Sequence, residues 1–260
     1  MIFTTAQINA WVGEFLWPFM RVAMVFAVAP IFGGQLLPMK IRVTTALAIT
    51  WLLIPVIPPV PAVDPLSALG LIVALQQLLT GLIMGFVLQM VFAAFAIGGQ
   101  TIAMSMGLGF ASMVDPQNGV QGPVIGQYYT ILASLLFLAL DGHLVLIGVL
   151  ADSFTFLPVA GSGVSRDVLW SVVAWAGRMF AGGVLIAIPA VSALLLTNIT
   201  FGVITRSAPQ LNIFGVGFPL TLTLGFIIMI NALPSLLPQF NNLVSAAFAL
   251  VQGMTPGPGS

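Results

Sequence analysis

Few side chains in this sequence could do chemistry. It has six Lys or Arg, six Asp or Glu, one His and no Cys in 260 residues. Asp141 and His143 interrupt an apolar run, and an ionisable pair in such a setting indicates an ion or proton relay. The alternative is a tight turn between two helices, in which Gly142 relaxes the backbone and Asp141 caps the next helix. We favour the turn, because the pair has no further titratable neighbours to pass a proton on.

Three other charged residues lie in long apolar runs. Glu14 and Arg21 are seven residues apart, which places them on one stripe of a helix but too far apart to pair. Arg206 is the only charged residue between Met179 and Ser260. A guanidinium keeps its proton, so it must reach water, a lipid headgroup, a carboxylate or backbone carbonyls. We therefore expect Glu14 and Arg21 to be buried polar residues and Arg206 to make a specific contact.

The composition excludes several classes of function. The chain is 60% hydrophobic and 5% charged, with a mean hydropathy of +1.16, whereas a soluble domain is about 25% charged. This composition predicts a protein embedded in a membrane or in an apolar assembly. With zero net charge and no basic stretch, we expect no nucleic-acid partner. Without cysteine, and with one histidine, we expect no metal site and no cofactor. The sequence also lacks a Gly-x-Ser-x-Gly elbow, a P-loop and a close carboxylate pair, so we expect no enzymatic activity.

Apolar runs of about 20 residues predict an all-α protein of roughly six to eight helices. We expect one domain over residues 1–252, followed by a disordered tail at 253–260. The N-terminus lacks the basic region of a signal peptide, so we expect the first helix to be retained. Lys40 and Arg42 predict a cytoplasmic loop. The expected helices are Ile8–Ile31, Ile41–Ile54, two segments within Pro65–Val114 that are separated at Gly98-Gly99, Val124–Leu140, Val168–Thr205, Gly215–Leu233 and Gln239–Val251, with a polar loop at Asp152–Asp167.

Glycines and amides within the apolar runs predict close packing of helices. Gly81-Leu-Ile-Met-Gly85 has the spacing that lets two helices approach closely in a membrane. Side-chain amides can form hydrogen bonds between such helices. The amides in these runs are Gln76, Gln77, Gln89, Gln100 and Gln127.

The middle of the chain has an unusual composition. From Gly107 to Pro116, glycines, methionine and phenylalanine precede an Asp-Pro turn. Non-helical backbone at membrane depth is tolerated only where it is buried in protein or lines a cavity. The segment therefore predicts a pore element, in which Met and Phe provide a deformable apolar gate. The alternative is an ordinary loop in which Asp115 caps the next helix, and the residues alone leave both interpretations open.

Three motifs in this order resemble the FliR family of flagellar type III export gate subunits. They are Gly107-Leu-Gly-Phe-Ala-Ser-Met-Val-Asp-Pro116, Leu140-Asp-Gly-His143, and Arg206-Ser-Ala-Pro-Gln-Leu-Asn-Ile-Phe214 followed by Gly217-Phe-Pro219. The resemblance covers essentially the whole chain. It implies kinked helical hairpins, with a FliP-like portion followed by a FliQ-like hairpin. The injectisome subunits of the SpaR and YscT type are similar, so injectisome use is an alternative.

The resemblance implies a non-enzymatic role in protein secretion at the flagellar basal body, in the bacterial inner membrane. The expected partners are FliP and FliQ, which form the gate with FliR-like subunits, then FlhB and FlhA, and unfolded export substrates. The resemblance also assigns a plug loop to about residues 105–122, with Met106, Gly107, Gly109, Phe110, Ser112, Met113, Asp115 and Pro116. The candidate interface or anchor residues that it implies are Arg206, Pro209, Gln210 and Asn212.

A different class of function remains open at this point. Glu14, Arg21, Asp141 and His143 in apolar surroundings, together with interrupted helices, are also features of an ion-coupled secondary transporter. We find no inverted repeat in the sequence, which weighs against this alternative.

Overall fold

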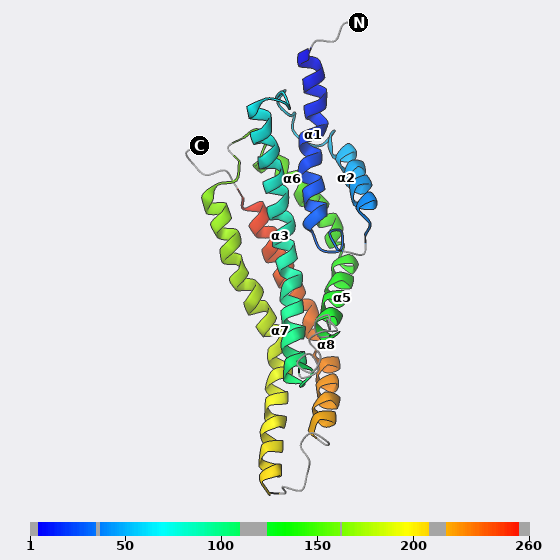
Figure 1. Cartoon of the computed structure of the whole chain (residues 1–260), viewed down its shortest axis with the longest axis vertical. Helices are drawn as coiled ribbons and strands as arrows, with labels where there is room; N and C mark the ends of the chain where they lie inside the picture. Colours follow the sequence, from blue (N-terminus) through cyan, green and yellow to red (C-terminus); the bar gives the residue numbers. More distant parts are fainter. Residues whose placement is uncertain (1–4, 35–36, 110–123, 162, 208–216, 255–260) are drawn as a thin grey trace, which may run out of the picture. The chain divides into compact units, whose positions relative to one another are not determined.

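The protein is described by a computed structural model that covers all residues except 1–4, 35–36, 110–123, 162, 208–216 and 255–260. The described residues are helical and contain no strand, which confirms the predicted all-α class. Figure 1 shows the helices with their labels. Their bounds are Thr5–Val28 (α1), Met39–Leu53 (α2), Ala68–Ser105 (α3), Val124–Ala139 (α5), Gly142–Phe156 (α6), Arg166–Ser207 (α7) and Phe218–Gln252 (α8).

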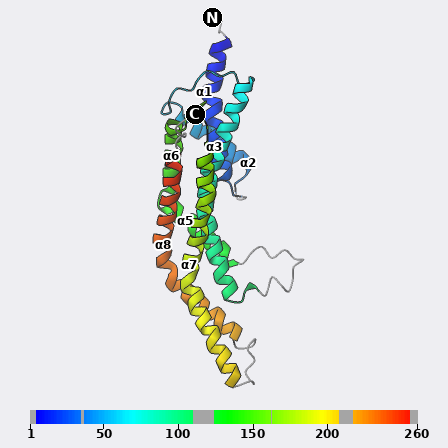
Figure 2. The ribbon, with the colours of Figure 1, turned by 90° about the vertical axis from the view of Figure 1, so that its left-hand side faces the viewer.

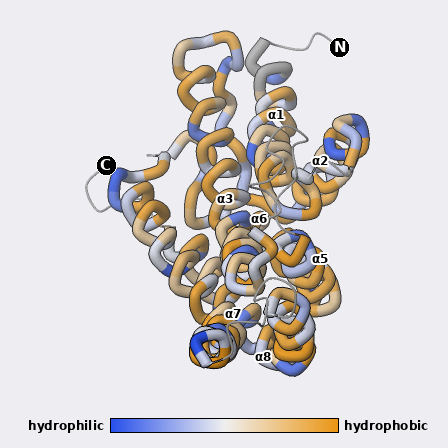
Figure 3. The backbone as a smooth tube through the Cα atoms, turned by 60° about the horizontal axis from the view of Figure 1, so that its bottom comes forward, coloured by the Kyte–Doolittle hydropathy of each residue, from blue (hydrophilic) through white to orange (hydrophobic). Residues whose placement is uncertain are grey.

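Several of these helices could cross a membrane. Within the described residues, four are long and apolar enough to do so: Ala10–Val28 of α1, and the whole of α3, α7 and α8. The bent pair α5 and α6 could together make a fifth span. Figure 3 shows hydrophobic residues along most of the length of the helices. The protein is therefore an all-α membrane protein, as the composition predicted.

The chain forms two compact units that share its longest helices. Unit 1 comprises Met1–Met90, Phe137–Ala176 and Val244–Ser260, and unit 2 comprises Val91–Leu136 and Gly177–Leu243. The unit boundaries fall inside α3, α5, α7 and α8. The prediction of a single domain over residues 1–252 stays a prediction.

Unit 1 is held together by a close crossing of α1 and α3. A Cβ on Gly85 would lie 2.9 Å from the Cβ of Val28 and 3.1 Å from the backbone N of Ala29. A Cβ on Gly81 would overlap the carbonyl oxygen of Arg21, earlier on α1. The two glycines thus bring the helix backbones together, as their spacing predicted. The short helix α2 lies beside α1, as Figure 1 shows.

Unit 2 corrects the predicted helix break at Gly98-Gly99. Both glycines lie inside α3, which continues to Ser105. A Cβ on Gly98 would lie 3.1 Å from the carbonyl oxygen of Gly183 on α7. A Cβ on Gly99 would lie 2.8 Å from the carbonyl oxygen of Ile125 on α5. The glycine pair therefore gives α3 two close helix contacts, and this packing offsets the low helix propensity of glycine.

The C-terminal helix corrects a second prediction. We expected two helices with a break between Leu233 and Gln239, but α8 is continuous and contains Pro234 and Pro238. Each proline removes one backbone donor, whereas ending a helix leaves about four N–H and four C=O groups unpaired. In an apolar environment the second cost is larger, so the helix continues.

The predicted polar loop at Asp152–Asp167 is also too long. Helix α6 continues through Asp152 to Phe156, so the connection to α7 begins at Leu157. Ser165 marks the other end of this connection, since its hydroxyl accepts a hydrogen bond of 3.3 Å from the backbone N of Val168 at the start of α7.

Candidate functional sites

Arg21 is the most completely enclosed charged residue in the described part of the chain. Its side chain is 1% exposed on α1, inside unit 1. Nε donates to Oε1 of Gln77 at 2.8 Å. Nη1 donates to the carbonyl oxygen and the hydroxyl of Ser153 at 2.8 and 3.0 Å, and Nη2 donates to the carbonyl oxygen of Leu157 at 2.7 Å. The guanidinium also lies 4.1 Å from the ring centre of Phe154, within cation–π range.

The acceptors of Arg21 come mainly from one helix end. Ser153 and Leu157 belong to the last turn of α6 and its C-cap. The carbonyl of Leu157 lies beyond the last helical hydrogen bond, whereas the carbonyl of Ser153 also accepts a hydrogen bond of 2.9 Å from the backbone N of Leu157. The negative end of the helix dipole is also there, so it favours a cation. The Ser153 hydroxyl donates to the carbonyl of Leu150 at 2.6 Å, which leaves its oxygen free to accept from Arg21. Arg21 therefore caps the C-terminus of α6 from α1, through uncharged acceptors.

The neighbouring amides Gln76 and Gln77 on α3 make different contacts around Arg21 and the end of α6. Gln77 is buried and accepts the hydrogen bond from Arg21. Gln76 lies against the connection between α6 and α7, where a Cβ on Gly163 would be 2.8 Å from its Nε2. Gly163 has a φ of 73°, a conformation that other residues rarely adopt. The hydrogen bonds of Arg21 to Gln77, Ser153 and Leu157 join α1, α3 and α6 and hold the start of the α6–α7 connection. The role of these residues is structural.

Arg21 stands out in the sequence, but its partners do not. Ser153 and Leu157 are 132 and 136 residues away in the sequence, so no periodic pattern connects them to Arg21. Gln77 was predicted only as a packing amide. Glu14, which shares a helical stripe with Arg21, is exposed in the structure, so the prediction that it is buried was wrong. The two residues therefore do not share an environment.

The Asp141-Gly142-His143 segment forms a turn between α5 and α6. We expected Gly142 to relax the backbone at this turn, but the residue with the left-handed conformation is Asp141, with a φ of 54°. The side chain of Asp141 makes no capping hydrogen bond. The backbone carbonyl of Asp141 accepts hydrogen bonds from the backbone N–H groups of Leu144 and Val145 at 2.9 and 3.1 Å. Gly142 is required for space, because a Cβ would lie 2.5 Å from the ring of Phe137. His143 is half-buried, and its Nδ1 has no hydrogen-bond partner among the described residues.

The structure describes only the beginning of the predicted plug. Met106 is fully buried, and its side chain covers Gly225 of α8 in unit 2, where a Cβ would lie 2.6 Å from Met106 Cε. Gly107 then has a φ of 85°, which turns the chain away from the axis of α3. Gly109 is half-buried. The other predicted plug residues lie outside the described residues; they are Phe110, Ser112, Met113, Asp115 and Pro116.

Arg206 lies in the last turn of α7 and is exposed. A basic residue at this place is favoured by the negative end of the helix dipole. The neighbouring residues predicted to shape the same contact lie outside the described residues; they are Pro209, Gln210 and Asn212.

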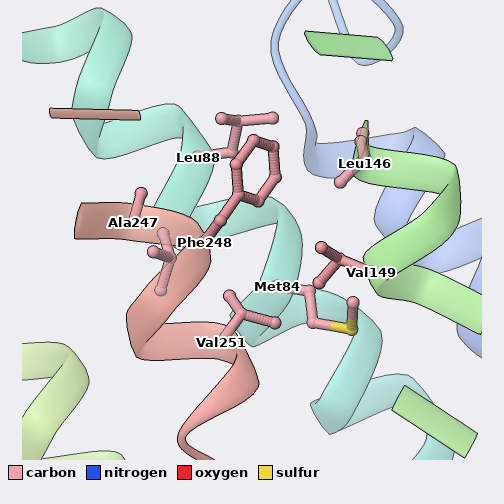
Figure 4. A pocket seen from close by; sticks show the side chains of 8 residues that line it. Met84, Leu88, Leu146, Val149, Ala247, Phe248 and Val251 are labelled. Carbon is pink, nitrogen blue, oxygen red and sulfur yellow. The ribbon is translucent and has the colours of Figure 1, made fainter. Parts of the chain in front are cut away.

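Unit 1 also contains a small apolar cavity of about 10 Å³. Figure 4 shows its lining: Met84 and Leu88 from α3, Leu146 and Val149 from α6, and Ala247, Phe248 and Val251 from α8. The last turns of α8 lie beside α6, as Figure 2 also shows. A cavity of this size has room for about one water molecule and is too small for a ligand. Within the described ranges, no three His, Asp or Glu side chains come together to bind a metal ion.

Comparison with known proteins identifies the family. Residues 12–247 match the family described as "Bacterial export proteins, family 1". The chain is 36% identical over 248 residues to the flagellar biosynthetic protein FliR of Escherichia coli, with 95% of each chain covered. It is 35% identical to FliR of Pectobacterium carotovorum over 96% of each chain, and 27% identical to FliR of Bacillus subtilis over 92% of this chain and 93% of that one. The chain therefore belongs to family 1 of the bacterial export proteins, and it is similar along almost its whole length to the flagellar FliR proteins.

Proposed function

We propose that this chain is a subunit of the flagellar type III protein export gate, located in the inner membrane at the flagellar basal body. The observation that carries the proposal is similarity over about 95% of the chain to proteins named for flagellar biosynthesis. The same names favour flagellar use over injectisome use. Its role is to build the secretion channel, without catalysis.

The proposed partners are FliP and FliQ in the gate, with FlhB, FlhA and unfolded flagellar proteins as further contacts. In support, many large apolar side chains are exposed along α3, α5, α7 and α8. A tagged copy of the chain, extracted from flagellated cells with mild detergent, should bring FliP and FliQ with it. A chain that purifies alone, and that takes up a small solute by itself in vesicles, would instead be a transporter.

The segment from Gly107 to Pro116 is proposed to close the channel. In support, Met106 holds the preceding end of the segment against α8, and Gly107 turns the chain out of α3. An apolar constriction can hold back ions by dewetting and still yield to a threading polypeptide. The proposed closure depends on the apolar side chains of this segment, Phe110 and Met113 among them.

Shortening the segment between Gly107 and Pro116 should let small ions cross the membrane. Cells that carry the shortened chain should lose growth in high external sodium, and their membrane conductance should rise. The matched control removes Pro58 and Pro59 from the exposed connection between α2 and α3. An ion barrier that is unchanged by the shortening, in cells that contain normal amounts of the chain, would refute the plug.

Arg206 is proposed to hold a contact with another subunit or with a lipid headgroup. Arg206→Ala should reduce recovery of the gate complex and swimming by several-fold, because an exposed charge at a helix end forms its contacts outside the chain. Arg178→Ala is the control, since Arg178 is a second exposed arginine on the same helix. Normal assembly and swimming of the Arg206 variant would exclude this role.

A further inference from the structure

Helix α3 ends in a hydrogen-bonded cap immediately before the proposed plug segment. The backbone N of Leu108 donates to the carbonyl oxygen of Ala103, and the backbone N of Gly107 donates to that of Met104, both at 3.0 Å. Together with the left-handed backbone of Gly107, whose φ is 85°, these bonds form a Schellman motif. The direction in which the chain leaves α3 is therefore set by the backbone of residues 103–108, which we name the α3 cap.

Met106, inside the α3 cap, lies against helix α8. Its side chain is fully buried, and both Met106 and Gly225 belong to unit 2. A Cβ on Gly225 would lie 2.6 Å from both Cγ and Cε of Met106 and 2.8 Å from Sδ. Three consecutive atoms of the methionine side chain therefore lie across this glycine. Figure 1 shows the end of α3 beside α8.

This contact requires glycine at position 225. Cγ is only one bond from the Cβ of Met106, so an added methyl group at 225 would displace the whole side chain and not merely its flexible end. Packed interiors respond to a single added methyl group, because they contain few voids. The backbone of Met106 is part of the α3 cap, so a displacement of its buried side chain also displaces the cap.

Met104, two residues earlier, makes a different contact. It is 60% exposed, and a Cβ on Gly109 would lie 2.6 Å from its Sδ. At about 100° per residue, Met104 and Met106 point about 200° apart on α3. Of the two methionines, Met106 is the one that attaches the α3 cap to another helix, whereas Met104 covers the chain that follows the cap.

We propose that the contact between Met106 and Gly225 positions the plug, by fixing the α3 cap from which the segment Gly107 to Pro116 begins. The inference rests on the proposed function, since it requires that segment to close a channel. Met106 and Gly225 are positioning residues, because they hold the α3 cap against α8 and act on the channel through the segment that follows. An ordinary core contact would affect only the stability of unit 2, whereas a positioning contact also affects the ion barrier.

Gly225→Ala tests the contact without changing the plug segment. In cells that carry this variant, we expect membrane conductance to rise several-fold and growth in high external sodium to be lost, while hook and filament proteins are still secreted. Met106→Ala should have the same effect, because it removes the three atoms that lie across the glycine. The two substitutions together should raise the conductance no more than the stronger single variant, because both remove the same contact.

Two glycines of α7 in unit 2 provide matched controls. A Cβ on Gly182 would lie 2.9 Å from Cδ1 of Leu243 on α8, so Gly182→Ala crowds a different contact with the same helix. A Cβ on Gly202 would meet no heavy atom within 4 Å, so Gly202→Ala adds a methyl group without crowding. We expect both variants to keep the ion barrier, because neither crowds Met106.

The outcomes separate this inference from the proposed function. If shortening the plug segment raises the conductance but Gly225→Ala and Met106→Ala do not, in cells with normal amounts of the chain, the contact does not position the plug. If the shortened chain keeps the barrier as well, the plug itself is refuted.

The controls decide the remaining cases. A rise in conductance with Gly182→Ala as large as that with Gly225→Ala would mean that any crowding of α8 opens the barrier, and it would overturn the inference. If the Gly225→Ala chain is recovered in low amounts, Met106→Ala decides, because that substitution introduces no overlap.

Discussion

Replacing Arg21 with methionine should lower the thermal unfolding midpoint of the purified chain by roughly 6 to 12 °C, which corresponds to about 3 kcal/mol for a chain of this size. Methionine fills much of the volume of arginine but donates no hydrogen bond. The carbonyl oxygen of Leu157 and the amide oxygen of Gln77 would then lose this donor in a buried site, whereas the carbonyl of Ser153 would keep its hydrogen bond from the backbone N of Leu157. Each buried polar group left unpaired costs about 1–3 kcal/mol. Because the acceptor at Leu157 is a backbone carbonyl, no single apolar substitution can remove this cost.

The control for Arg21→Met is Arg178→Met, which removes the same charge from an exposed position on α7. It should change the unfolding midpoint by no more than about 2 °C, because surface substitutions usually stay within about 0.5 kcal/mol. Arg21→Lys should fall between the wild type and Arg21→Met, since one ammonium cannot reach acceptors that surround a planar guanidinium. If Arg21→Met unfolds at the wild-type temperature, the cap on α6 does not hold the unit together.

Replacing Gly81 with leucine should destabilise unit 1 to a similar degree. A Cβ at this position would overlap the carbonyl oxygen of Arg21 and lie 2.9 Å from the Cβ of Met24. Both atoms belong to or adjoin the α1 backbone, so they cannot turn aside as the end of a flexible side chain can. The helices must separate, and overpacking of this kind costs about 1–3 kcal/mol. Thermal unfolding of the purified chain measures the loss.

Gly148→Leu is the matched control for Gly81→Leu. Gly148 lies on α6 in the same unit and is exposed, and a Cβ added there would meet no heavy atom within 4 Å. That substitution should be neutral or slightly stabilising, because glycine is a poor helix former. The double variant Gly81→Leu with Arg21→Met should lose less than the sum of the two losses, since both act on the same contact. Equal effects at Gly81 and Gly148 would contradict a close α1–α3 crossing.

The helical class and most helix positions could be predicted from hydropathy alone, because apolar runs separated by charges and prolines correspond to helices. The errors came from glycine and proline. Gly98-Gly99, Pro234 and Pro238 usually interrupt helices, but here they lie within α3 and α8. Local propensity is overridden where helices cross closely and where unpaired backbone groups would meet an apolar environment.

The candidate sites could likewise be predicted from the sequence only in part. Gly81 and Gly85 were predicted to allow a close helix contact, and their spacing was sufficient evidence because it is local. The partners of Arg21 could not be predicted, because they come from parts of the chain more than 50 residues away and include backbone carbonyls, which every residue has. The turn at Asp141 was expected, but its details were not, because the need for glycine at 142 comes from the ring of Phe137.

The most direct test of the proposed function is secretion of flagellar proteins by cells that lack this chain. Hook and filament proteins in the culture medium are measured in the deletion strain, and in the same strain after the wild-type chain is restored. We expect these proteins to be made but to stay inside the deletion strain, and the restored chain to return them to the medium. Normal secretion of flagellar proteins without this chain would contradict its assignment to the export gate.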